Sequence, residues 1–155
     1  MKLIKVLCIF FAMSLFGQQE TLAKFSITES TANGKDNTTF DIDRGGYFVI
    51  YKKDYKLFLA NVSAAWNQQS YGVIHQLKGE TLEESKNQFK ADIFNFRWKF
   101  YNDYDDKTGY ATIRMTKVYK PQGVYFTLKM ILPNLDILTY KGYMEGSLDF
   151  NDFIK

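Results

Sequence analysis

Ile93–Tyr101, with the sequence IFNFRWKFY, decides the fold of this 155-residue chain. Large apolar side chains occupy every second position, and polar or amphipathic side chains stand between them. Because successive side chains of a β-strand point to opposite faces, this alternation predicts a strand with one buried face. The apolar row is Phe94, Phe96, Trp98 and Phe100, and the polar row is Asn95, Arg97, Lys99 and Tyr101.

Three further strands are predicted after it, at Tyr110–Tyr119, Val124–Ile131 and Ile137–Gly146, separated by turn segments rich in Asp, Gly, Pro and Asn. Pairing Tyr101 with Tyr110 places Phe96 opposite Met115 and keeps the apolar side chains on one face. We therefore predict an antiparallel meander. Its inward row is either a filled core, as expected at this size, or the lining of an apolar pocket. That row is Phe94, Phe96, Trp98, Phe100, Ile113, Met115, Phe126, Leu128 and Met130.

The preceding half of the chain has strand-like segments at Gly46–Tyr51, Lys56–Val62 and Ser70–Leu77, with Phe40–Asp43 as a further candidate. A capping box, formed by Thr81 and Glu84, predicts one short helix near residues 81–91. The expected fold is all-β: an antiparallel meander of seven to eight strands that forms a small barrel or a sandwich.

The N-terminus has the layout of a secretory signal peptide, because Lys2 and Lys5 precede the apolar run Val6–Phe16. That run is too short to span a bilayer, so no transmembrane helix is expected. Cleavage after residue 17 or after residue 23 would leave a small residue at the cut. The predicted organisation is a signal peptide (1–17 or 1–23), a flexible polar leader (24–38) and a single β domain (39–155).

Loss of the signal peptide changes the composition of the chain. The only cysteine, Cys8, leaves with it, so the mature protein has no thiol for catalysis, metal binding or a disulfide. The formal net charge of +3 also shrinks, because Lys2 and Lys5 are removed. An exported protein without disulfides fits the periplasm or exterior of a bacterium.

No catalytic constellation is found. His75 is the only histidine, and no nucleophile-elbow motif accompanies it. The acidic cluster at residues 103–106 fits a hairpin turn better than a calcium loop, because it lacks the glycine and distal glutamate of an EF-hand. We expect no enzyme activity, no catalytic residue, no metal or other cofactor, and no nucleic-acid partner.

The polar face of the meander is the strongest candidate binding surface. The expected register places Arg97 opposite Arg114, and Arg114 opposite Lys129. Like charges directly across strands are destabilising, and an anionic ligand would offset them, although a solvated face is the simpler interpretation. The candidate residues for an anionic glycan or envelope component are Arg97, Lys99, Arg114, Lys129, Tyr101, Tyr110 and Tyr125.

The sequence thus predicts an exported small β-domain with a non-enzymatic binding or envelope-associated role. One alternative is a barrel of the lipocalin type that carries a small apolar ligand, although the Gly-x-Trp signature of its first strand is not found. The other is an eight-stranded outer-membrane barrel, in which Arg97, Arg114 and Lys129 would be costly on a lipid-facing surface.

Overall fold

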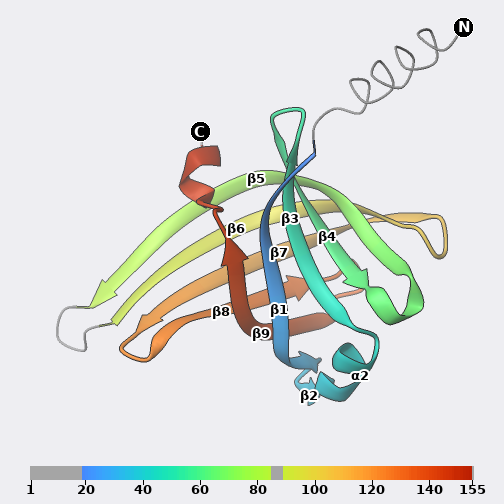
Figure 1. The fold of residues 1–155 in the computed structure, drawn as a ribbon, viewed down its shortest axis with the longest axis horizontal. Helices are drawn as coiled ribbons and strands as arrows, with labels where there is room; N and C mark the ends of the chain where they lie inside the picture. The colour runs from blue at the N-terminus through green and yellow to red at the C-terminus, as the bar shows by residue number, and fades with distance from the viewer. Residues whose placement is uncertain (1–18, 85–88, 155) are drawn as a thin grey trace, which may run out of the picture.

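The computed structural model describes residues 19–84 and 89–154, and in this part of the chain nine strands form one antiparallel sheet (Figure 1). The all-β prediction is confirmed. The strands are β1 (Glu20–Ala32), β2 (Lys35–Asp36), β3 (Gly46–Lys53), β4 (Lys56–Ser63), β5 (Gln68–Glu84), β6 (Phe89–Asn102), β7 (Lys107–Lys120), β8 (Gly123–Ile131) and β9 (Ile137–Gly146). The remaining elements are the helix α2 (Thr38–Asp43) and two 3-10 turns, η1 (Ala64–Trp66) and η2 (Phe150–Phe153).

The sheet closes on itself because β1 pairs with both β3 and β9. The β1–β9 seam runs from Ala23 opposite Gly146 to Ala32 opposite Leu138. Strands β1 and β3 to β9 make up a closed eight-stranded barrel, and β2 lies outside the closure. The sequence predicted either a barrel or a sandwich, and the protein folds as a barrel.

Strand β1 corrects the prediction of a flexible leader at 24–38, since Glu20–Ala32 is a strand paired on both sides. Its inward side chains Leu22, Ala23 and Phe25 are buried. The exposed residues of β1 are polar, which masked the strand in the sequence. The expected signal peptide falls mostly on residues 1–18, which lie outside the described residues.

Two local predictions of element type were wrong. Residues 80–84 and 89–91 are not helical but belong to β5 and β6, with Thr81 opposite Asp92; residues 85–88 lie outside the described part of the chain. The hydroxyl of Thr81 donates to Asp92 across the strands (2.8 Å) instead of capping a helix. Phe40–Asp43, a candidate strand, lies in α2. Cross-strand pairing overrides the local capping pattern at 81–84.

The predicted register is confirmed for β7–β8 and β8–β9, where Met115 lies opposite Leu128 and Met130 opposite Leu138. Between β6 and β7 it is wrong by two residues, because Phe96 lies opposite Ile113. The turn spans only residues 103–106, so β7 begins earlier than expected. A shift of two keeps every side chain on its predicted face.

The body of the barrel is filled by the predicted inward row. Its members are buried, apart from Phe100 and Phe126, which are partly buried and pack against the same core. Trp98 also satisfies its indole N–H, which donates to the carbonyl of Leu59 (3.0 Å). The expectation of a filled core is therefore confirmed for the middle of the barrel.

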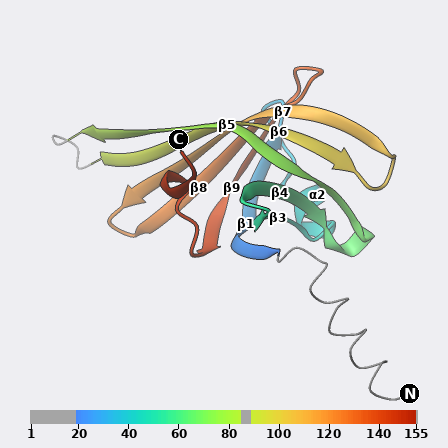
Figure 2. The same ribbon diagram turned by 90° about the horizontal axis from the view of Figure 1, so that it is seen from above.

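The two ends of the barrel differ (Figures 1 and 2). Helix α2 packs at the end of β1 that leads into β2. At the other end, β4 pairs with β5 only as far as Val73, and β9 pairs with β8 only as far as Phe126. The ends of β5 to β8 on this side therefore extend beyond the closed ring as a four-stranded sheet, and this end is open.

Candidate functional site

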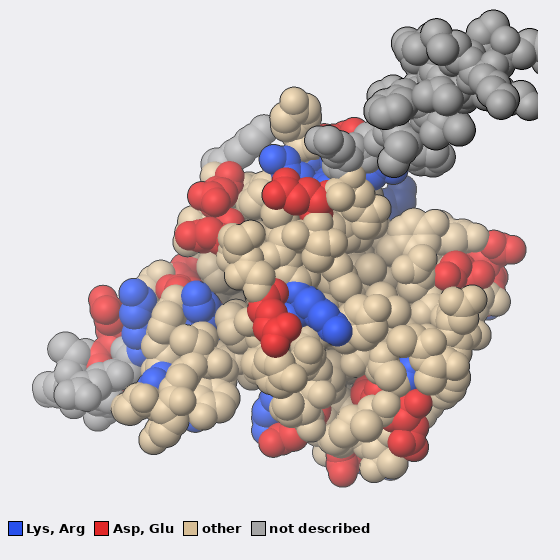
Figure 3. All heavy atoms as spheres, in the orientation of Figure 1, with Lys and Arg blue, Asp and Glu red and all other residues tan. Residues whose placement is uncertain are grey.

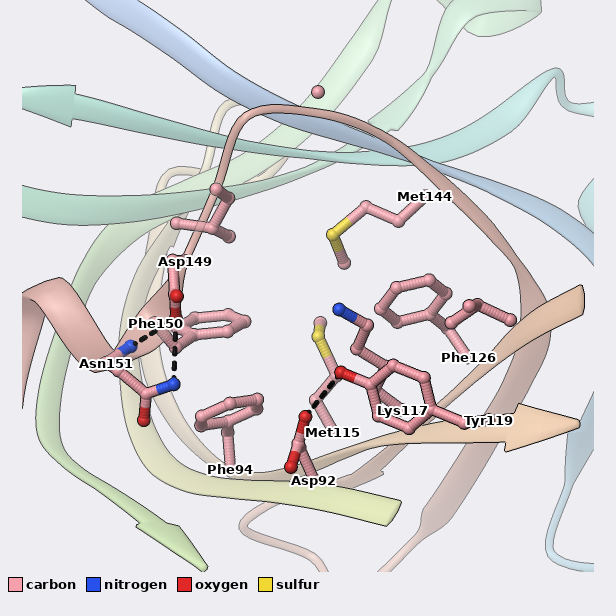
Figure 4. Close-up of a pocket in the computed structure, with 13 residues that line it drawn as sticks. Asp92, Phe94, Met115, Lys117, Tyr119, Phe126, Met144, Asp149, Phe150 and Asn151 are labelled. Atoms are coloured by element: carbon pink, nitrogen blue, oxygen red, sulfur yellow. Dashed lines mark hydrogen bonds between the residues drawn. The ribbon is translucent and has the colours of Figure 1, made fainter. Parts of the chain in front are cut away.

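A pocket of about 340 Å³ lies at the open end, between the extended sheet and the segment that follows β9 (Figure 4). The mouth of a small barrel is a common position for a ligand site, and this volume is at the lower end of the usual range. We refer to it as the mouth pocket. Its lining residues are Asp92, Phe94, Met115, Lys117, Tyr119, Val124, Phe126, Met144, Gly146, Leu148, Asp149, Phe150 and Asn151.

One wall of the mouth pocket is apolar and continuous with the core. Phe94 and Met115 come from inward positions of β6 and β7 and are almost fully buried. Phe150 of η2 packs against Phe94 with ring centroids 4.7 Å apart. Asp149 holds η2 in place, since its carboxylate accepts hydrogen bonds from the backbone and side-chain nitrogens of Asn151, both at 2.9 Å.

The other wall is polar, because the inward-facing residues of β6 and β7 are polar instead of apolar beyond the core. On β7 the inward residues after Met115 are Lys117 and Tyr119, and Asp92 of β6 lies directly opposite Lys117. Asp92 Oδ2 accepts a hydrogen bond from the Tyr119 hydroxyl (2.6 Å), and its Oδ1 accepts one from Thr81. Both oxygens of this carboxylate are thus engaged within the protein.

The surroundings of Asp92 keep it ionised at neutral pH. Burial opposes ionisation, but the hydrogen bonds from Tyr119 and Thr81 and the charges of Lys90 and Lys117 outweigh it, so the pKa lies below its usual value. Lys90 stands at the outer edge of the same group, with its ammonium 5.3 Å from the ring centroid of Tyr119. The four residues Lys90, Asp92, Lys117 and Tyr119 form what we call the mouth cluster.

The arrangement suits an amphipathic molecule. Aromatic and thioether side chains offer an apolar surface, and the mouth cluster offers charge and hydrogen bonds beside it. No group of three or more His, Cys, Asp or Glu side chains within residues 19–84 and 89–154 is placed to hold a metal ion.

The surface predicted from the sequence lies elsewhere, on the outside of the barrel, and only part of it comes together. Arg97 and Lys99 both lie over the ring of Tyr110, at 5.3 and 5.8 Å from its centroid. Arg114 lies opposite Lys129, as predicted, but its other neighbour is Asn95; the predicted Arg97–Arg114 opposition is wrong, because the β6–β7 register is shifted.

The remaining predicted residues stand apart from this group. Tyr101 packs against Tyr71 (5.6 Å between centroids) and donates to Asp106 in the adjoining turn. Tyr125 lies under the ammonium of Lys120, at 5.1 Å. The seven residues therefore form separate small contacts along the outer face instead of one site.

Sequence reasoning missed the polar residues of the mouth pocket. The signal was present, since Lys117 and Tyr119 continue the inward spacing of Ile113 and Met115. A cation at a predicted inward position is unusual, and it marks the point where the core ends and solvent enters.

No helix in the described part of the chain combines the length and apolarity needed to cross a membrane. Comparisons of the chain with protein-family models, with curated proteins and with solved structures returned no match.

Proposed function

We propose that this protein is an exported, non-enzymatic binding protein that holds a small amphipathic molecule in the mouth pocket. The observation that carries the proposal is the pocket itself, in which a wall of Phe94, Met115 and Phe150 meets the mouth cluster. Small barrels of the lipocalin type also use an open end in this way, and the fold is compatible with such a carrier role.

A titration tests the proposal. We expect decanoic acid to bind the purified mature protein with a stoichiometry of one by isothermal titration calorimetry. Val124→Trp adds a bulky ring to a pocket-lining position and should weaken binding at least about tenfold by filling the space. Thr127→Trp, three positions further along β8 and on the outer face, is the matched control and should bind normally. Equal binding by both variants, or none by the wild type, would refute the proposal.

Export is supported by the N-terminal sequence pattern, and the place of β1 bears on the cleavage site. Leu22 and Ala23 are buried, and the Leu22 carbonyl accepts a hydrogen bond from the backbone N–H of Ser147 (2.9 Å). Cleavage after residue 23 would remove both residues from the barrel, so we propose cleavage after Gly17. Intact mass measurement of the protein from the exported fraction tests this, and a chain beginning at Lys24 would contradict it.

The distribution of polarity favours this function over an outer-membrane barrel. The interior of the barrel is apolar, whereas Arg97, Lys99 and Arg114 are exposed on its outside. Membrane-spanning barrels show the reverse, with an apolar outer band. On the face shown in Figure 3, charged side chains of both signs are scattered among uncharged ones.

A second candidate function uses the outer face. The two cations over Tyr110, and the like-charged pair of Arg114 and Lys129, favour an anionic glycan or envelope component. An ion pair offsets part of the positive charge of Arg114, whose Nη2 lies 3.8 Å from Glu80 Oε1. If the combined change Arg97→Ala, Arg114→Ala and Lys129→Ala leaves binding to a panel of anionic glycans unchanged, this candidate is wrong.

A further inference from the structure

Lys117 is the least expected residue of the mouth pocket. It occupies an inward position of β7, directly opposite Asp92 of β6 and Phe126 of β8. Its side chain is half-buried, and its ammonium group points into the space that the lining side chains enclose (Figure 4). A charge in such a place loses part of its hydration, and this cost is offset only by an opposite charge or by hydrogen bonds.

Residues 19–84 and 89–154 place no counter-ion within 4.0 Å of the Lys117 ammonium. Among these residues, its nearest recorded partners are the rings of Tyr119 (4.9 Å) and Phe126 (6.0 Å). Asp92 is close enough for its pKa to respond to Lys117, yet its two oxygens accept from Tyr119 and Thr81. Asp149, on the other side of the pocket, accepts both hydrogen bonds from Asn151 at one oxygen, Oδ1.

Lys117 is the one cation among the lining residues of the mouth pocket, and its ammonium has no ion-pair partner within 4.0 Å among the described residues. Lys90, Lys117 and Asp92 surround Tyr119, while Asp149 adds a second carboxylate to the lining and Glu83 lies opposite Lys90. An anion placed against Lys117 would therefore complete the cluster, while an apolar chain attached to it would lie against Met115, Phe126 and Phe150. A neutral hydroxyl would accept a hydrogen bond from the ammonium without neutralising its charge, and a cationic head group would be repelled.

We propose that the mouth pocket selects amphiphiles with a carboxylate head group, and that Lys117 is the residue that recognises the carboxylate. This inference rests on the proposed binding function and specifies its ligand class. A charge-assisted hydrogen bond of this kind should make an acid bind about tenfold more tightly than the alcohol of the same chain length.

Paired titrations with decanoic acid and decan-1-ol at neutral pH test the inference. The wild type should bind the acid about tenfold more tightly than the alcohol. Lys117→Met keeps an unbranched side chain, one atom shorter, but removes its charge, so its affinities for the acid and the alcohol should become equal. Lys107→Met removes an exposed charge at the opposite end of the same strand and should keep the preference.

The outcomes separate the two proposals. Equal affinity of the wild type for acid and alcohol, or an unchanged preference in Lys117→Met, would overturn the role of Lys117 and leave the binding function standing. Failure of the wild type to bind either compound would overturn the binding function. Far-UV circular dichroism and a thermal melt of each variant confirm that the barrel is folded in the sample that is titrated.

Discussion

Arg44 and Asp41 form a buried ion pair beside α2, at the end of the barrel opposite the mouth. Arg44 Nε donates to Asp41 Oδ1 (2.6 Å), and Arg44 Nη1 donates to Ser63 (2.5 Å). Ser30 and Asn37 donate to the other oxygen of Asp41. Charges removed from water are stable only when they are fully paired, so this group depends on all of its members.

Arg44→Met is therefore expected to lower the free energy of unfolding by about 3–5 kcal/mol, because it leaves the Asp41 carboxylate buried and unpaired. The double variant Asp41→Leu/Arg44→Met removes both charges and should be more stable than the single variant. Urea denaturation measures both. Arg97→Met, on the exposed outer face, is the control and should change stability by less than about 0.5 kcal/mol. A double variant less stable than Arg44→Met would contradict the explanation.

Asp92 gives the mouth cluster a predictable response to acid. Its pKa is lowered in the folded protein, so its charge stabilises the fold at pH values above the unfolded pKa, and this contribution is lost as the pH falls through the folded pKa. Asp92→Asn lacks this contribution. The difference in unfolding free energy between wild type and variant should therefore narrow between pH 7 and pH 3. Urea denaturation at the two pH values checks this, and a difference that widens in acid would contradict it.

At the scale of elements, Gly142 of β9 marks the tightest point of the β1–β9 seam. A Cβ atom at this position would lie 1.9 Å from the carbonyl oxygen of Ser26, so a side chain fits only if β1 moves away. The register of β1 is irregular at the adjoining residues 27–29, which indicates that the strand already bends here.

Gly142→Ala should consequently loosen the seam and destabilise the barrel by at least about 2 kcal/mol. Hydrogen exchange should rise first in the amides of β1 and β9, while those of β6 and β7 stay protected. Thr139→Ala, on the same strand, provides a control whose effect should be small. Uniform loss of protection over all strands would show that the seam is not the weak point.

The elements differ in how well the sequence predicts them. β6 to β9 were predictable because their apolar side chains alternate without interruption, as in Phe94, Phe96 and Trp98. β1 was not, because it pairs with two neighbours and has few bulky apolar side chains, namely Leu22, Phe25 and Ile27. The prediction of a helix near 81–91 failed because strand pairing also decides the structure there. A local capping pattern is weaker than a continuous ladder of cross-strand hydrogen bonds.

The candidate site was less predictable than the fold. The apolar wall of the mouth pocket was predictable, because Phe94 and Met115 belong to the predicted inward row. The contact between η2 and Phe94 was not predictable, because no pattern in residues 147–154 indicates it. The outer-face residues were chosen partly on a register that was wrong by two positions between β6 and β7. Register depends on the length of the turn, which composition alone does not determine.

At the scale of the whole molecule, the apolar interior and the charged residues on the exterior favour the proposed localisation. We expect it in the soluble periplasmic or extracellular fraction without detergent, because Arg97, Lys99 and Arg114 are exposed on the outside of the barrel. Cell fractionation followed by immunoblotting measures this. Recovery only from detergent-extracted outer membranes would contradict both the localisation and the proposed function.

The seam between β1 and β9 also sets the timing of folding. The first and last strands of the barrel are more than a hundred residues apart, as the hydrogen bond from Lys141 to Glu29 illustrates with a separation of 112. Contacts this remote in sequence fold slowly, on a scale of milliseconds to seconds. The ring cannot close before β9 has been synthesised, so the preceding strands remain an unclosed chain until then. An unclosed chain is the form that a secretion channel threads, which is compatible with the proposed export.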